Sequence, residues 1–273
     1  MTDLVIWAGP VAKYQVPGAE VPGAAEVWLS CTGDGALPPK CADVSDALGY
    51  PGPELEAVAA RAGLRPAQVD RIILGAHSAG GAVLARLLED PDIWEKTVAV
   101  LLSDATYSSW TGSGQARRPA PRSVWAEFAV EVARSPNKVF LASASPSPNG
   151  TAPTGVETLR EIRRQAEAKL GRSFEDTSGW FGVDPGPELV TRAGNVLFAE
   201  FPMEPHGHGH IKFAPTVWHQ VFQNWPESLW LPGGASPKPP LPEFQKDSSD
   251  WFVWVALGVG ALIGYHALKQ WRR

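Results

Sequence analysis

The sequence has little cysteine and no excess of positive charge. Its two cysteines, Cys31 and Cys41, could pair in an oxidising compartment. Free thiols fit better, because nothing else in the sequence indicates export. The formal net charge of −5 provides no basic surface for nucleic acid and argues against that class of partner. The opening residues, MTDLVIWAGPVAKY, lack the basic start and long apolar run of a signal peptide, so none is expected.

Signatures of nucleotide binding and of repeat architectures are also missing. The stretch GAHSAGG (75–81) has no Lys-Ser/Thr pair, so it is not a phosphate-binding loop. The turn TGSG (111–114) has no strand pattern before it. No internal repeat occurs. We therefore expect no nucleotide and no other cofactor.

Charge is absent from one long stretch near the C-terminus. Residues 251–268 contain no Asp, Glu, Lys or Arg, and as a helix they would extend about 27 Å, close to the thickness of a bilayer core. Trp251, Trp254 and Trp271 lie near the ends of this stretch, as interfacial anchors do. A buried terminal helix is the alternative, but this helix would be apolar on every side. The sequence predicts a transmembrane helix at 251–271.

The composition divides the rest of the chain into two parts. Residues 231–250 are rich in Pro, Gly and Ser and predict an extended linker, so residues 1–230 form the predicted globular domain. Basic residues follow the span, which favours a cytoplasmic C-terminus and an external domain. The lack of a signal peptide favours the opposite orientation. We expect the domain on the cytoplasmic side, held by a single-pass C-terminal anchor.

The globular part alternates between strand and helix patterns. Continuous apolar runs or β-rich segments predict strands, and apolar residues at helical spacing predict helices. The predicted strands are 3–8, 25–31, 71–76, 97–103, 137–143 and 195–201, and the predicted helices are 53–64, 80–90, 123–134, 156–170 and 214–225. This order predicts an α/β fold, a three-layer sandwich with a mostly parallel central sheet and helices on both faces.

The stretch RIILGAHSAGG (71–81) carries the main chemical signal. A buried strand ends in a sharp turn and a helix begins, with Ser78 at the apex of the turn. In a nucleophile elbow the residues two before and two after the nucleophile are small, and here they are Ala76 and Gly80. Ala76 departs mildly from the usual glycine. The N–H of Ala79, at the start of the helix, is the expected first donor to an oxyanion.

These features together resemble the α/β-hydrolase superfamily over about residues 1–225. The features are GAHSAGG followed by a helix, a strand ending in LLSDA, and a late histidine after the final strand. Within the superfamily the chain looks most like bacterial and phage hydrolases. The resemblance implies acyl transfer, in which a serine attacks a carbonyl, a histidine acts as base, and a carboxylate orients the histidine.

The resemblance places the histidine after the last strand, in EPHGHGHIKF (204–213). In such families the histidine often stands three residues before the first apolar position of the next helix. His208 fits this spacing to Ile211 best, and His210 is second. His206 is third, because it directly follows Pro205.

The acid is harder to assign. The superfamily usually places it after the strand that is here 137–143, but no carboxylate follows that strand. Asp104, at the carboxyl end of the preceding strand, is the preferred candidate, because some members of the superfamily take their acid from that position. Capping of a turn is the structural alternative for Asp104. Asp184, Glu157 and Glu204 are the substitutes.

The remaining site predictions concern the oxyanion hole and the substrate pocket. A second oxyanion donor could come from Gly9 in WAGP (7–10) or from CTGDG (31–35), and Gly9 is better placed if its strand is central. His77, beside the nucleophile, lines the pocket or simply packs. Tyr107, Trp110 and Trp125 could form an acyl pocket or the packing of a small cap.

We therefore expect a membrane-anchored serine hydrolase that acts on a small-molecule or lipid ester near the membrane. Two other classes of function stay open. A degenerate hydrolase fold could act as a tethered binding protein, since Ala76 departs from the motif and the usual acid is missing. Alternatively, HGHGH (206–210) could bind a metal ion if it were an extended strand, although the intervening glycines favour a loop.

Overall fold

The computed structural model describes residues 2–9, 23–30, 54–106, 108–114, 117–146, 152–177 and 187–202. All of them belong to one compact unit that spans Met1–Pro232. Among these residues there is no helix with the length and apolar character needed to cross a membrane. The predicted linker at 231–250 and the predicted span at 251–271 lie outside the described residues.

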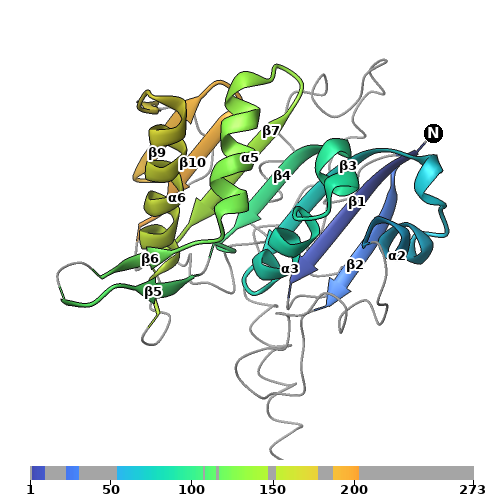
Figure 1. Cartoon of the computed structure of the whole chain (residues 1–273), viewed down its shortest axis with the longest axis horizontal. Helices are drawn as coiled ribbons and strands as arrows, with labels where there is room; N and C mark the ends of the chain where they lie inside the picture. The colour runs from blue at the N-terminus through green and yellow to red at the C-terminus, as the bar shows by residue number, and fades with distance from the viewer. Residues whose placement is uncertain are drawn as a thin grey trace, which may run out of the picture. The chain divides into compact units, whose positions relative to one another are not determined.

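The centre of the fold is an eight-stranded sheet with the order β2-β1-β3-β4-β7-β10-β9-β8 (Figure 1). Its strands are β1 (Thr2–Gly9), β2 (Ala25–Ser30), β3 (Val69–His77), β4 (Thr97–Ser103), β7 (Val139–Ala144), β8 (Glu175–Asp176), β9 (Leu189–Ala193) and β10 (Val196–Glu200). The first six strands in this order, β2, β1, β3, β4, β7 and β10, are parallel to one another. Strand β9 pairs antiparallel with β10, and β8 pairs antiparallel with β9. The predicted α/β class and the mostly parallel sheet are confirmed.

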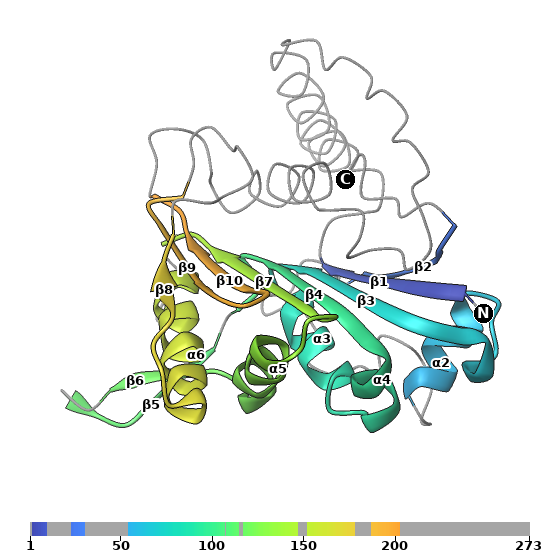
Figure 2. The same cartoon turned by 90° about the horizontal axis from the view of Figure 1, so that it is seen from above.

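The described helices connect these strands on one side of the sheet. They are α2 (Glu54–Arg61), α3 (Gly80–Leu87), α4 (Pro91–Lys96), α5 (Ser123–Arg134) and α6 (Gly155–Leu170), with a short 3-10 turn, η2 (Pro66–Gln68). Figure 2 shows these helices together beneath one face of the sheet. The helix predicted at 214–225 lies outside the described residues, and the second helical layer stays a prediction.

Strand β3 illustrates how both faces of the sheet are buried. Ile72, Leu74 and Ala76 belong to the hydrophobic core on the helix side. Ile73 and His77 alternate with them and point to the opposite face, where they are also buried. A strand buried on both sides reads as a continuous apolar run, which explains why the sequence predicted it correctly.

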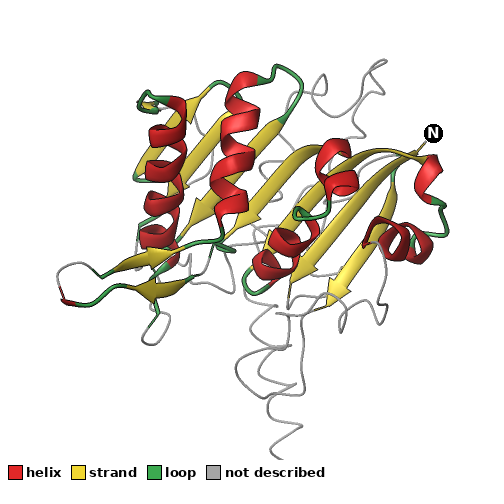
Figure 3. Cartoon of the chain, viewed as in Figure 1, coloured by secondary structure: helices red, strands yellow, loops and turns green. Residues whose placement is uncertain are grey.

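The structure differs from the predicted elements in three places (Figure 3). The helix predicted at 80–90 ends at Leu87, and a separate helix that was not predicted, α4, begins at Pro91. The Asp90 carboxylate starts α4 by accepting hydrogen bonds from Asp92 N and Ile93 N. The polar excursion after β4 contains a hairpin of β5 (Ser109–Thr111) and β6 (Arg118–Ala120). Strands β8 and β9 at the antiparallel end of the sheet were not predicted at all.

Candidate active site

Ser78 directly follows β3, in the two-residue connection to α3, and has a backbone conformation that few residues adopt. Its φ is +54°, and Asp104 with +47° is the only other non-glycine residue with positive φ among the described segments. A left-handed backbone costs a residue with a Cβ roughly 1–2 kcal/mol. Such strain persists only where the surroundings enforce it, and it concentrates at functional sites. The sharp strand-to-helix turn predicted around Ser78 is therefore present.

Glycines behind Ser78 allow this turn to pack against the neighbouring chain. A Cβ on Gly80 would lie 2.0 Å from the carbonyl oxygen of Ala8 and 2.7 Å from the nitrogen of Gly9. A Cβ on Gly81 would lie 1.7 Å from the carbonyl oxygen of Ala105. Only glycine fits at either position without moving backbone. The start of α3 thus lies directly against the ends of β1 and β4.

The two predicted oxyanion donors lie close together. Gly9 ends β1, which pairs with β3 in the sheet, and its nitrogen faces Gly80 at the start of α3. Ala79 takes the N-cap position of α3, with φ −57° and ψ −19°. Within the part of the chain that the structure describes, no hydrogen bond uses the N–H of Ala79. Both groups occupy the carboxyl edge of the sheet, where open α/β sheets bind ligands.

Asp104 follows β4 as Ser78 follows β3. His77 and Ser103 are Cα partners in the parallel ladder, so Ser78 and Asp104 are the next residues on adjacent strands. The Asp104 side chain is fully buried. Its Oδ1 accepts a hydrogen bond from Ser145 N at 3.1 Å, and its Oδ2 accepts one from Ser145 Oγ at 2.8 Å. A buried carboxylate needs such donors, because an unpaired buried charge is costly.

His77 forms a bridge between the strands that carry Ser78 and Asp104. Its ring is buried, and Nδ1 donates to the carbonyl oxygen of Ser103 at 2.9 Å. A carbonyl oxygen can only accept, so Nδ1 carries a proton. This bond fixes the ring against β4. A structural role for His77 is therefore present, and its role in a substrate pocket stays a prediction.

Other predicted residues have different surroundings. Trp125 lies in α5 and is part of the helix-side core, 6.4 Å from the ring of Phe140, which agrees with the packing alternative. Trp110 lies on the β5–β6 hairpin, where the Arg117 guanidinium stacks 4.5 Å above its ring. That contact agrees with the packing role that the sequence left open.

Glu157, one of the substitute acids, caps the N-terminus of α6. Its Oε2 accepts from Thr154 N at 2.8 Å, and its own N–H donates to Thr154 Oγ1 at 3.2 Å. This is a capping box, which explains a carboxylate at this position without catalysis. The remaining candidates lie outside the described residues: Tyr107, His206, His208, His210, Asp184 and Glu204.

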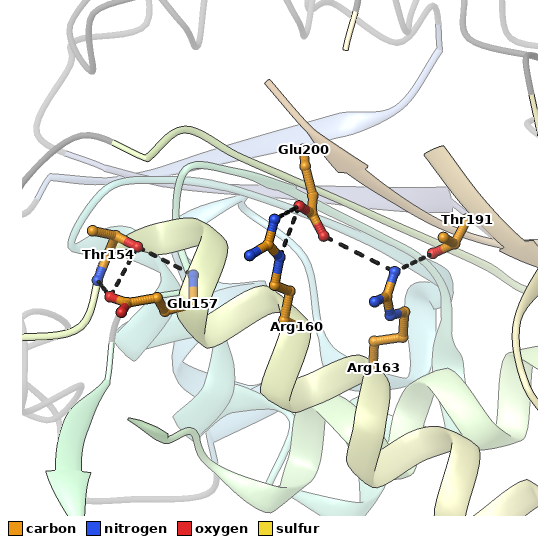
Figure 4. Close-up of polar contacts among 6 residues, drawn as sticks. All are labelled: Thr154, Glu157, Arg160, Arg163, Thr191 and Glu200. Atoms are coloured by element: carbon orange, nitrogen blue, oxygen red, sulfur yellow. Dashed lines mark hydrogen bonds and ion pairs between the residues drawn. The ribbon is translucent and has the colours of Figure 1, made fainter. Parts of the chain in front are cut away.

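Sequence reasoning missed a second buried carboxylate, Glu200 at the end of β10. Arg160 donates to its Oε2 from Nε at 2.9 Å and from Nη2 at 2.6 Å, and Arg163 lies 3.9 Å from its Oε1 (Figure 4). The Glu200 hydrogen bond raises the pKa of Arg160 above its ordinary value. Because two arginines of α6 bind the Glu200 carboxylate, this residue joins α6 to the sheet through ion pairs, which is a structural role.

Metal ligands do not gather in the described segments. No group of three or more His, Cys, Asp or Glu side chains there could hold a metal ion. The HGHGH segment at 206–210 lies outside those segments, so the metal hypothesis is not tested by this observation.

The chain was compared with protein-family models, curated proteins and solved structures. No family model matches it, and no curated protein matches its sequence. It is similar to Est1E from Butyrivibrio proteoclasticus, with 11% identity, a TM-score of 0.39, and coverage of 81% of this chain and 87% of that chain. It is also similar to the metagenomic carboxyl esterase MGS0156, with 14% identity, a TM-score of 0.27, and coverage of 82% and 73%.

Likenesses this distant decide neither family nor activity. The class of the protein follows from its own topology, which is an α/β fold with a mostly parallel eight-stranded sheet. The side chains at the carboxyl edge of that sheet are the basis for a functional proposal.

Proposed function

We propose that the protein is a serine hydrolase that cleaves an ester or related acyl bond. Ser78 is the nucleophile, His208 or His210 is the general base, and Asp104 orients that histidine. The observation that carries the proposal is the pair of strained residues, Ser78 and Asp104, which directly follow adjacent parallel strands. Both are held in a rarely populated backbone conformation at the edge where α/β proteins bind ligands.

The reaction follows from the groups at this edge. Ser78 Oγ attacks the carbonyl carbon while its proton passes to the histidine. The N–H groups of Ala79 and Gly9 donate to the oxyanion that forms. The histidine then protonates the leaving alkoxide, and an acyl-Ser78 ester remains. Water attacks this ester, gives its proton to the histidine, and releases the acid and free Ser78.

We further propose that residues 251–271 anchor the enzyme in a membrane and that residues 231–250 link the anchor to the domain. The apolar composition and the length of residues 251–268 support this anchor. A substrate at or near the membrane follows from such an anchor, with a lipid ester as the leading candidate. The domain is placed on the cytoplasmic side, and protease accessibility in sealed vesicles tests that orientation.

Labelling by a fluorophosphonate tests the nucleophile directly. This reagent modifies only activated serines, so we expect one label on the wild-type chain and none on Ser78→Ala. Ser109→Ala is the matched control, because Ser109 is an exposed serine on the β5–β6 hairpin. Its labelling should equal that of the wild type.

Two outcomes would reject the hydrolase. Folded wild-type protein that takes up no label would favour the tethered binding protein. Stoichiometric zinc, iron or manganese in purified full chain that takes up no label would favour metal-dependent chemistry at residues 206–210. Labelling that survives in Ser78→Ala would assign the activated serine to another position and would reject Ser78 as the nucleophile.

A further inference from the structure

Ser145 contacts the Asp104 carboxylate more extensively than any other residue in the described segments. It is the first residue after β7 and is buried, with 1% exposure. Its N–H binds Oδ1 and its hydroxyl binds Oδ2, so each carboxylate oxygen has one Ser145 donor. Hydrogen bonds to an ionised acceptor are about twice as strong as neutral ones. The two bonds together fix the plane of the carboxylate.

The backbone of Asp104 is attached to the same strand end. Asp104 N donates to the carbonyl oxygen of Ser143 at 2.8 Å. Residue 104 therefore has three hydrogen bonds to residues 143–145, one from its main chain and two to its side chain. These bonds offset the cost of its positive φ, and they hold the carboxylate in one orientation relative to β7.

The first residue of α6, Gly155, lies next to the Asp104 carboxylate. A Cβ on Gly155 would lie 2.5 Å from Asp104 Oδ1, so the bare Cα of glycine is needed there. Thr106 Oγ1 donates to the carbonyl oxygen of Gly155 at 3.3 Å and ties the segment after Asp104 to the same helix end. A side chain at position 155 would therefore displace the carboxylate or the start of α6.

We propose that Ser145 is a positioning residue for catalysis, which fixes the orientation of the Asp104 carboxylate, the acid of the proposed triad. A carboxylate has about four lone-pair sites, and Ser145 uses one on each oxygen. The remaining sites are then presented in a single direction. This inference rests on the proposed hydrolase function, and it adds a residue that acts through Asp104 rather than on the substrate.

Turnover of 4-nitrophenyl butyrate by the full chain in mild detergent tests the role of the hydroxyl. Ser145→Ala removes one charge-assisted hydrogen bond and should lower kcat about tenfold with KM unchanged. Ser145→Thr keeps a hydroxyl and should restore most of the rate. Ser145→Cys, with a weaker donor, should fall between them and keeps the test available if the alanine variant does not fold.

Ser103→Ala is the matched control. Ser103 is a buried serine at the same end of the adjacent strand β4, and its Oγ has no hydrogen-bond partner in the described structure. Its removal should change kcat less than about twofold. A loss equal to that of Ser145→Ala would attribute the effect to packing at this edge and would overturn the proposal.

A double-variant cycle separates positioning from general stability. Ser145→Ala should have no further effect on kcat once Asp104→Ala is present, because residues that act as one unit are not additive. Independent, multiplied effects would reject the positioning role. The two proposals also fail differently. Full turnover by Ser78→Ala would reject the proposed serine hydrolase itself. If Ser78→Ala loses turnover but Ser145→Ala keeps all of it, only the role of Ser145 is rejected.

Discussion

At the scale of single residues, the site is built on backbone strain and on glycines that permit it. Ser78 and Asp104 have positive φ, and each lies where a glycine of a helix start meets neighbouring backbone or side chain. Gly80 meets β1, and Gly155 meets the Asp104 carboxylate. These contacts define the geometry before any substrate binds, as pre-organised sites require.

The backbone strain at Ser78 should be measurable as a difference in the free energy of unfolding between two variants of this residue. Ser78→Gly and Ser78→Ala both remove the hydroxyl, but only glycine tolerates φ of +54° without cost. We expect Ser78→Gly to be more stable than Ser78→Ala by about 1 kcal/mol. Urea unfolding followed by tryptophan fluorescence measures the difference.

The neighbouring residue is the control for this prediction. Ala79 has an ordinary φ of −57°, so Ala79→Gly should lower stability rather than raise it. If Ser78→Gly and Ser78→Ala unfold at the same urea concentration, the positive φ stores no energy.

The sequence predicted the positions of Ser78 and Asp104 but not the partner of Asp104. A small residue on each side of Ser78 and a carboxylate at the end of a buried strand are local patterns that a sequence reveals. Ser145 is 41 residues from Asp104, and a serine after a strand is a common occurrence. The fold alone brings these two residues together, because β4 and β7 are neighbours.

At the scale of elements, an ion pair joins helix α6 to the end of strand β10. Arg160 on α6 is 59% exposed, whereas Glu200 on β10 is 7% exposed. The two partners of this ion pair therefore differ in how well water can replace the lost contact. The elements themselves were largely predicted, since α6 and β10 have strong periodic or continuous apolar patterns.

This asymmetry predicts unequal effects of removing each partner. Arg160→Met removes both Arg160 hydrogen bonds to Oε2 of the buried Glu200 carboxylate and should cost about 2 kcal/mol. Glu200→Gln leaves an arginine that water can solvate and should cost less than about 1 kcal/mol. Urea unfolding at pH 7 distinguishes them, and equal losses would contradict the role of burial.

A second pair on α6 should make stability depend on pH. The hydrogen bond from Arg164 lowers the pKa of Glu161 below its ordinary value of 4.5. A lowered folded-state pKa contributes stability above the unfolded value, and that stability is lost as the pH falls through the folded value. Glu161→Gln should therefore lower stability at pH 6, and this loss should become progressively smaller as the solution is acidified to about pH 2.

Unfolding of both proteins by urea between these pH values provides the measurement. The difference in unfolding free energy should shrink steadily as the solution is acidified from about pH 5. A difference that is constant over this range would mean that the Arg164 contact does not favour the ionised carboxyl.

At the scale of the whole molecule, the arrangement of the sheet was predicted better than its edges. The order of apolar runs indicated a mostly parallel sheet, and the structure confirms it. Strands β9 and β8 escaped prediction because Thr191 and Arg192 interrupt the apolar residues of β9, and β8 has only Glu175 and Asp176. Short polar strands are assigned by pairing with a neighbour, which a single sequence does not reveal.

The proposed anchor makes a prediction for the full chain in cells. If residues 251–271 span a bilayer, alkaline carbonate should leave the full chain in the membrane pellet. A chain that ends at Trp230 should appear in the supernatant and serves as the control. Extraction of the full chain by carbonate would contradict the anchor.

The two-residue strand β8 has a consequence for how molecules of this protein meet. A sheet edge with free N–H and C=O groups is a template on which another chain can add a strand. Here that edge is short and carries two exposed acidic side chains, Glu175 and Asp176. A second copy approaching this edge meets like charge and little backbone to pair with, so association through strand exchange is disfavoured at this side of the fold.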